Sequence, residues 1–326
     1  MRKRVSILSS VVFFLFFCGV TVHWGFWAHK RINRLAVFRL PAELQVFYKK
    51  NIDFITENAV NPDRRRYAVV GEAERHFIDL EVYGDSAAYT LPVFWKEAVA
   101  KYGEDSLRRH GIAPWYIQTA AYQLTEAFKV KDARRILRIS ADLGHYVADI
   151  HVPLHTTRNY NGQLTGQEGI HAFWESRLPE LYADHYQLWI GEPVYINSIS
   201  AEVWRVVHES HSALDSVFQF ERKLSTTISP EKKYSYELRN NILTRSYSRE
   251  FSDAYHRLLS GQVERRMKSS VRMVGNLWYT CWVNAGQPDL KNSEMPVDAA
   301  EDKNEKAAEP QSWLQRLFKV RPEADD

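Results

Sequence analysis

Cysteine is almost absent from this chain, since Cys18 and Cys281 are the two cysteines among its 326 residues. Cys18 lies in an apolar segment at the start of the chain, so a chain that loses this segment keeps one thiol and forms no internal disulfide. Cys281 stands near Tyr279 and Trp282 and is expected to be a buried, inert thiol. Thiolate metal sites and a cysteine nucleophile are therefore not expected.

An excess of charge of one sign is also missing. Lysine and arginine number 43 and aspartate and glutamate 40, and removal of Arg2, Lys3 and Arg4 leaves 40 basic residues (43 less 3) against 40 acidic ones. This balance lacks the basic footprint of a duplex-binding protein. No internal repeat of fixed period, no glycine-rich phosphate loop and no sustained two-residue alternation is evident, so a sheet is not expected.

Long apolar runs are limited to the beginning. The basic residues at positions 1–4 precede the run Val11–Val20, which is the order of a secretory signal peptide. We expect residues 1–23 to be removed and the protein to be exported, to the periplasm or the extracellular space. The alternative is an uncleaved N-terminal membrane anchor, although spanning a bilayer takes about 20 apolar residues. His23 is an unusual last residue for a leader, because small residues are preferred there.

The end of the chain differs in composition from the body. Residues 287–326 include an acidic and polar stretch without apolar periodicity, at 301–310, which cannot bury enough surface to offset its ordering entropy. We expect this segment to be a disordered acidic tail. The remaining residues 24–286 suffice for one large domain with a substantial core.

The body shows helical periodicity throughout, so the fold class predicted is all-α, a single multi-helix domain. Helices are expected at about 30–38, from 42, and at 93–102, 115–128, 132–150, 201–220, 236–259 and 262–284.

Two pairs of side chains that bind metals stand at helical spacing. His145 and Asp149 are four residues apart on the helix expected at 132–150 and project from one face, and His171 and Glu175 repeat the spacing, with His155 between the pairs. Imidazole and carboxylate are ligands of zinc where thiolate is absent. One such pair alone indicates an ion pair, whereas both pairs together with His155 predict a metal site.

These residues resemble those of the superfamily of S1/P1-type nucleases and bacterial zinc-dependent phospholipases C, which are all-helical enzymes with three zinc ions. The resemblance runs from Trp24 to about Asn284. The mature chain of the family begins with a tryptophan whose amine and carbonyl bind zinc, and the start Trp24-Gly25-Phe26-Trp27-Ala28-His29 is similar. The family's shared His-x-x-x-Asp helix and its Pro-Leu/Met-His segment are matched by His145–Asp149 and by Pro153-Leu154-His155.

The resemblance implies three zinc sites. The first would be held by Asp63, His76, His145 and Asp149; the second by Trp24, His29 and a bridging Asp149; the third by His155, His171 and Glu175. A water shared between two zinc ions would lose its proton near neutral pH and attack phosphorus, with Asp63 orienting it as the catalytic residue. The activity implied is that of a zinc-dependent phosphodiesterase.

The substrate implied differs between the two branches of the superfamily. His76-Phe77-Ile78-Asp79 is similar to the nuclease segment in which an aromatic ring stacks on a base and an aspartate hydrogen-bonds it, so Phe77 and Asp79 are candidate substrate-binding residues for single-stranded DNA or RNA. The alternative for Phe77 is packing in the core. Glu175, where the nucleases have aspartate, and the short interval from His155 to His171 point instead to phospholipid head groups.

Two other classes stay open at this point. A non-catalytic, zinc-stabilised binding protein would keep the ligands and close their open positions with side chains, and a metal-free helical protein would make the ligand match a coincidence. No obligate protein partner is indicated, and a monomer is expected. His110, His185, His208, His211 and His256 have no partner at metal spacing and are expected to have structural or surface roles.

Overall fold

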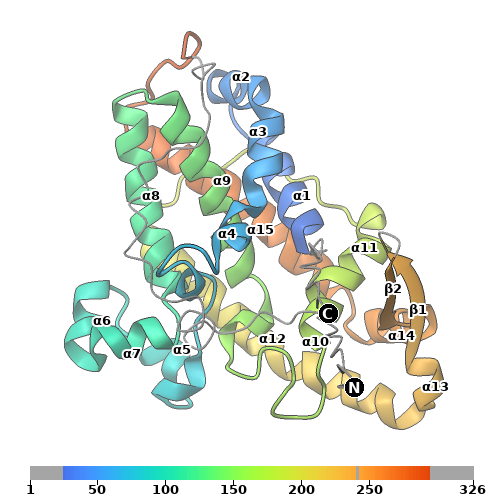
Figure 1. Cartoon of the computed structure of the whole chain (residues 1–326). Coiled ribbons are helices and arrows are strands. Elements are labelled where there is room, and N and C mark those ends of the chain that lie inside the picture. Colours follow the sequence, from blue (N-terminus) through green and yellow to red (C-terminus); the bar gives the residue numbers. More distant parts are fainter. Residues whose placement is uncertain (1–24, 240–241, 294–326) are drawn as a thin grey trace, which may run out of the picture.

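The computed structural model describes residues 25–239 and 242–293 (Figure 1). The expected leader, Trp24 and residues 294–326 of the expected tail lie outside these residues. The described chain is mainly helical, so the predicted all-α fold class is confirmed. The first half contains α1 (Gly25–Val37), α2 (Ala42–Lys50), α3 (Ile52–Glu57), η1 (Asn58–Val60), α4 (Asn61–Arg65), η2 (Ala73–Arg75), η3 (Leu80–Tyr83), α5 (Ala87–Thr90), α6 (Trp95–Tyr102), α7 (Glu104–Arg109), α8 (Ala113–Lys129) and α9 (Ala133–Ile150).

The second half contains η4 (Pro153–Thr156), α10 (Ile170–Ala172), the π-helix η5 (Phe173–Arg177), α11 (Leu178–Tyr182), η6 (Ala183–His185), α12 (Ile199–Thr227), α13 (Pro230–Lys233), strands β1 (Tyr234–Arg239) and β2 (Ile242–Tyr247), α14 (Arg249–Leu258) and α15 (Gln262–Asn284).

Helix α9 lies inside a bundle with α8, α15 and α1 (Figure 1). Asp132 caps its start by accepting a hydrogen bond from the Arg135 amide at 3.0 Å. In the core of this bundle the rings of Tyr48 and Trp278 stack with centroids 4.9 Å apart. Both side chains form hydrogen bonds with Ser140 of α9. The Tyr48 hydroxyl lies 2.8 Å from Ser140 Oγ, and the Trp278 indole donates to the Ser140 carbonyl at 3.2 Å. The bundle therefore fixes α9 from several sides.

Helix α1 approaches α9 closely at Gly144. A Cβ added there would lie 1.9 Å from Asn33 Oδ1, so the close approach requires glycine. The Asn33 side chain is fully buried and donates to the Ala141 carbonyl at 3.0 Å. This contact sets the position of the histidine one turn earlier on α1 relative to the polar face of α9.

A second apolar cluster lies around α10 to α14. Phe173 stacks on Tyr247 and Tyr255 with centroid separations of 3.8 and 4.8 Å, and Phe251 completes the group. Helix α12 has buried residues in both clusters, Val203 to Val207 in the first and Leu214 to Leu224 in the second. This long helix therefore joins the two clusters.

The prediction of a helix over 236–259 is wrong in its first half. Residues Tyr234–Arg239 and Ile242–Tyr247 pair as an antiparallel hairpin, and α14 begins at Arg249, where Ser248 Oγ accepts from the Phe251 amide at 3.1 Å. Tyr236 and Leu238 alternate with less exposed neighbours along β1, a period of two that the helical interpretation overlooked. The expectation that a sheet is absent therefore fails at this hairpin.

The packed body continues past residue 286. The Trp282 indole donates to the Pro288 carbonyl at 3.0 Å, and Leu290 is buried against the first cluster. The first residues of the expected tail, 287–293, thus lie against the domain. Among the described residues, no helix combines the length and apolarity needed to cross a membrane.

Candidate metal centre

Six separate segments bring the predicted ligands to one place. His29 comes from α1, Asp63 from α4, His76 from the residue after η2, His145 and Asp149 from α9, His155 from η4, and His171 and Glu175 from α10 and η5. Three groups with ligand atoms within 4.8 Å of one another result: His29, His145 and Asp149; Asp63, His76 and His145; and His155, His171 and Glu175. All eight predicted ligands among the described residues therefore meet.

Trp24, the ninth predicted ligand, lies outside the described residues. Its neighbour Gly25 begins α1, and a Cβ added to Gly25 would lie 3.7 Å from Glu175 Oε1. The chain therefore enters α1 beside the three groups.

The group of Asp63, His76 and His145 is compact. His145 Nε2 lies 3.1 Å from His76 Nδ1 and 3.3 Å from Asp63 Oδ1, and His76 Nδ1 lies 3.5 Å from the same Asp63 oxygen. These three donor atoms converge on one point, as the ligands of a tetrahedral metal do.

Asp149 faces two groups with its two oxygens. Oδ1 lies 3.4 Å from His29 Nε2, whereas Oδ2 lies 2.9 Å from His76 Nδ1 and 3.3 Å from His145 Nε2. The ring of His29 stacks on that of His145 with centroids 4.0 Å apart. This arrangement is that of a carboxylate placed between two metal positions.

Glu175 is a second carboxylate whose two oxygens face different groups, an arrangement that its spacing in the sequence does not predict. Oε2 lies 2.7 Å from His171 Nε2 and 3.4 Å from His155 Nε2, and the two imidazole nitrogens are 3.1 Å apart. Oε1 instead lies 3.4 Å from His29 Nε2. Glu175 thereby connects the third group with His29.

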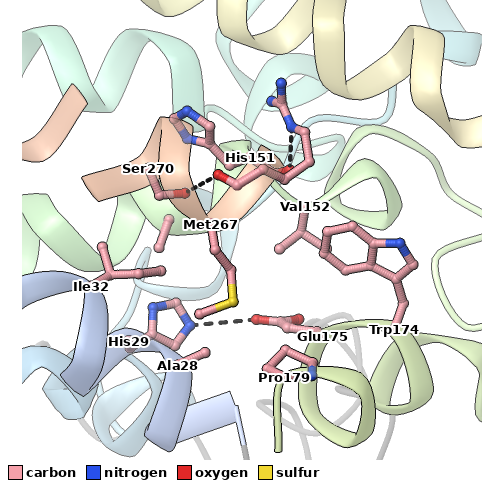
Figure 2. Close-up of a pocket in the computed structure, with 12 residues that line it drawn as sticks. Ala28, His29, Ile32, His151, Val152, Trp174, Glu175, Pro179, Met267 and Ser270 are labelled. Atoms are coloured by element: carbon pink, nitrogen blue, oxygen red, sulfur yellow. Dashed lines mark hydrogen bonds and ion pairs between the residues drawn. The ribbon is translucent and has the colours of Figure 1, made fainter. Parts of the chain in front are cut away.

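A pocket adjoins the centre on the side of α15. Figure 2 shows His29 and Glu175 facing each other at its edge, while Ile32, Met267 and Trp174 supply apolar walls. His151, Arg266 and Ser270 line the same pocket, so its wall is partly polar.

Backbone carbonyls accept hydrogen bonds from two of the imidazoles, at the ring nitrogen that faces away from the centre. His145 Nδ1 is 2.9 Å from the Ala59 carbonyl, and His155 Nδ1 is 2.6 Å from the His76 carbonyl. A carbonyl can only accept, so both rings carry a proton on Nδ1, and Nε2 is the ring nitrogen that faces the centre. Metal-binding histidines are oriented in this way.

The buried carboxylates of the centre are ionised and therefore favour positive charge beside them. Burial alone would raise the pKa of the Asp149 carboxyl, but the His145 and His155 imidazoles hold this pKa well below its usual range. Burial likewise opposes ionisation of Glu175, and hydrogen bonds from His155, His171 and His29 outweigh it, lowering its pKa. Buried carboxylates that stay ionised require compensating positive charge, which metal ions supply.

One edge of the centre is accessible. Asp149, His76 and His145 have side-chain exposures of 0–1%, whereas Asp63, His171 and Glu175 are 13–14% exposed. Among the described residues, ligands therefore enclose the inner side, and the outer edge is partly exposed. A catalytic metal site needs such an exposed position, whereas a structural site is closed.

Phe77 and Asp79, the candidate base-binding residues, are buried at 4% and 6% exposure. A Cβ added to Gly111 would lie 2.6 Å from the Phe77 ring, and the Phe77 carbonyl accepts from the Ala113 amide at 3.2 Å. Asp79 lies 3.6 Å from His110. The structure thus packs this segment against the start of α8, and a base-binding role for it stays a prediction.

Histidines outside the predicted ligand set have other neighbours. His151 lies 2.7 Å from the Val147 carbonyl and 3.2 Å from Ser269 Oγ, and burial together with the Arg266 charge lowers its pKa well below the usual value. The Tyr186 hydroxyl lies 2.9 Å from His256. Neither histidine reaches the centre.

Sequence reasoning missed Glu72, which is fully buried next to the first group. It stands four residues before His76, at the same spacing that identified the other pairs. That spacing could have drawn attention to it.

The sequence matches no protein-family model and no curated protein. Among solved structures, the chain is similar to an alpha-toxin of Clostridium perfringens from the avian strain SWCP, with 12% identity and a TM-score of 0.47 over 81% of this chain. It is also similar to the alpha-toxin of Clostridium absonum, with 12% identity and a TM-score of 0.45, again over 81% of this chain. The chain spans 65% of the length of each of these toxins.

Proposed function

We propose that the chain is a zinc-dependent phosphodiesterase, exported and monomeric, that hydrolyses P–O ester bonds with a metal-activated hydroxide. The observation that carries this proposal is the joining of three ligand groups by two carboxylates, Asp149 and Glu175, each with one oxygen toward either side. Carboxylates in this position would hold metal ions close together, the arrangement of two-metal sites that hydrolyse phosphate esters.

The donor set fits zinc. Five imidazoles and three carboxylates converge without a thiolate, and nitrogen and oxygen donors of these types are ligands that zinc accepts. The ions would be held by Asp63, His76, His145 and Asp149; by His29 and Asp149, together with Trp24; and by His155, His171 and Glu175. Bound zinc supplies a hydroxide near neutral pH and neutralises the phosphoryl oxygens.

The protein side chains have separate tasks in this proposal. Asp63 stands at the accessible edge, where its carboxylate accepts a hydrogen bond from the attacking water and orients it. The imidazoles of His145 and His155, fixed by backbone carbonyls, keep the donor atoms in place without further rearrangement. The buried inner side excludes bulk water from the carboxylates.

For the substrate we propose single-stranded nucleic acid, on the basis of the resemblance of the segments 24–29 and 76–79 to the nuclease branch. Phospholipid is the second candidate, and two observations favour it. Phe77, the expected stacking ring, is buried, and the third group ends in Glu175, the residue type of the phospholipase branch.

The deciding assay offers denatured DNA and phosphatidylcholine to one preparation of the chain beginning at Trp24, with and without a chelator. Nucleotide release that the chelator abolishes, with lipid intact, supports the nuclease; cleavage of lipid alone assigns the phospholipase and leaves the metal centre standing. Bound zinc without hydrolysis of either compound or of a synthetic phosphodiester would contradict the enzymatic proposal.

A matched pair of variants controls for the histidine substitution itself. His155→Ala removes a ligand of the third group and is expected to abolish hydrolysis. His185→Ala removes an exposed histidine outside the centre and is expected to leave hydrolysis unchanged.

A further inference from the structure

His76 is oriented differently from His145, the other imidazole of the first group. It directs Nδ1 into the centre, 2.9 Å from Asp149 Oδ2, so Nε2 is on the outer side of the ring. Nε2 is buried and has no hydrogen-bond partner within 3.5 Å. Glu72 Oε1 lies 3.7 Å from it. The gap exceeds a normal N–H···O hydrogen bond by about 0.7 Å, a distance that a small rotation of the His76 ring would close.

Glu72 is held firmly in this position. Its carboxylate is fully buried, and Oε2 accepts from Arg65 Nε at 2.8 Å and from Arg75 Nη1 at 3.0 Å. Oε1 accepts from the hydroxyl of Tyr146, which follows the ligand His145 on α9. Three donors from three segments therefore fix the carboxylate that faces His76.

The arginine that binds Glu72 is itself anchored to α9. Arg65 donates to both oxygens of Asp142, at 3.2 and 2.9 Å, and it stands two residues after the ligand Asp63. The cluster of Arg65, Glu72, Arg75, Asp142 and Tyr146 thus ties the segments of Asp63, His76 and His145 to one another. Two arginines balance its two carboxylates, as a buried cluster of charges requires.

We propose that Glu72 is a positioning residue for the metal ligand His76: it accepts a hydrogen bond from Nε2–H and so leaves Nδ1 as the donor to the metal. This inference rests on the proposed zinc centre. A carboxylate behind a metal-bound imidazole orients the ring and raises its basicity, and loss of such a partner costs about 10–100-fold in metal affinity. No backbone carbonyl performs this task for His76, whereas carbonyls do so for His145 and His155.

The test measures zinc affinity of the chain beginning at Trp24 by competition with a chromophoric chelator. Glu72→Gln keeps the size of the side chain and removes its charge, and we expect one of the bound zinc equivalents to weaken about 10–100-fold while the others are unchanged. The matched control is Glu74→Gln, the same substitution two residues along the chain, at a glutamate whose side chain accepts from Arg108 Nη1 at 2.6 Å. We expect it to keep the wild-type affinity.

Each outcome decides a different point. Wild-type protein without zinc would overturn the proposed function and this inference together. Zinc bound by the wild type, with equal affinity in Glu72→Gln, would overturn the inference alone. Equal losses in Glu72→Gln and Glu74→Gln would show a general structural effect in place of positioning. If Glu72→Gln fails to fold by circular dichroism, Glu72→Asp replaces it, with a smaller loss expected because the carboxylate is retained but withdrawn; unchanged affinity there would equally overturn the inference.

Discussion

Replacement of Asp149 by asparagine tests the bridging arrangement most directly. The carboxylate places one oxygen toward His29 and the other toward His76 and His145, at 3.4, 2.9 and 3.3 Å. Asparagine has one oxygen, and its amide nitrogen cannot bind a cation, so at most one side keeps a ligand atom and both sides lose the negative charge. We expect Asp149→Asn to lose the first and second zinc ions together.

The size of this effect follows from the burial of Asp149, which is 1% exposed. Removing one partner of a buried ionic interaction costs about 3–5 kcal/mol. At about 1.4 kcal/mol per factor of ten, metal affinity should fall by roughly two to three and a half orders of magnitude. The third group does not include Asp149 and should keep its ion.

Elemental analysis after dialysis at a buffered free zinc concentration measures the stoichiometry of the variant, and chelator competition measures the affinities. Asp184→Asn, at an exposed aspartate paired with Arg31, is the control for the same substitution outside the centre. A folded Asp149→Asn protein that retains every zinc equivalent at wild-type affinity would refute the bridging interpretation.

Glu175→Gln is expected to remove the third zinc ion and weaken the second, and loss of the third ion alone in elemental analysis would limit this carboxylate to one group. Gly144→Ala is expected to lower the free energy of unfolding by about 1–3 kcal/mol, because the added methyl would collide with Asn33, and an unchanged midpoint in urea would contradict the close approach of α1 and α9. Burial raises the pKa of the Cys281 thiol to about 12 from its ordinary value of 9.0. The native state therefore keeps this proton while the unfolded chain loses it, so the contribution of Cys281 to stability is intact below pH 9 and decreases as the pH rises toward 12. Iodoacetamide at pH 9 should accordingly leave Cys281 unmodified until urea is added, and mass spectrometry that finds rapid native alkylation would show an accessible thiol. A precursor retaining residues 1–23 is expected to be inactive, because the amine of Trp24 would be an amide, and full activity would exclude a ligand role for this residue.

The helical body and the two i, i+4 ligand pairs were predictable because both depend on the spacing of residues close together in the sequence. The i, i+4 pairs His145–Asp149 and His171–Glu175 lie on helices that the apolar periodicity or the pairs themselves indicated. Segments farther apart, such as those of His29 and Asp63, were assigned through the family resemblance and not through geometry. The structure places them at the same centre.

Features set by long-range packing were not predictable. The contact of Glu175 with His29 depends on how η5, a π-helix, passes the start of α1, and the burial of Phe77 depends on the close approach of Gly111. Neither contact produces a periodic pattern in the sequence. The hairpin at 234–247 does produce one, in the alternation of Tyr236 and Leu238, but this pattern is only a few residues long.

The assembly of the centre from distant segments also sets the entropic cost of forming each part of it. His155 and Glu175 are 20 residues apart, whereas His29 and Asp149 are 120 apart (149 less 29), a sixfold longer loop. Closing the longer loop costs about 1.6 kcal/mol more in chain entropy, at about 0.6 kcal/mol for each doubling. The entropic cost of bringing three ligands together is therefore smaller in the third group, whereas the site of His29 also requires α1 to dock on α9.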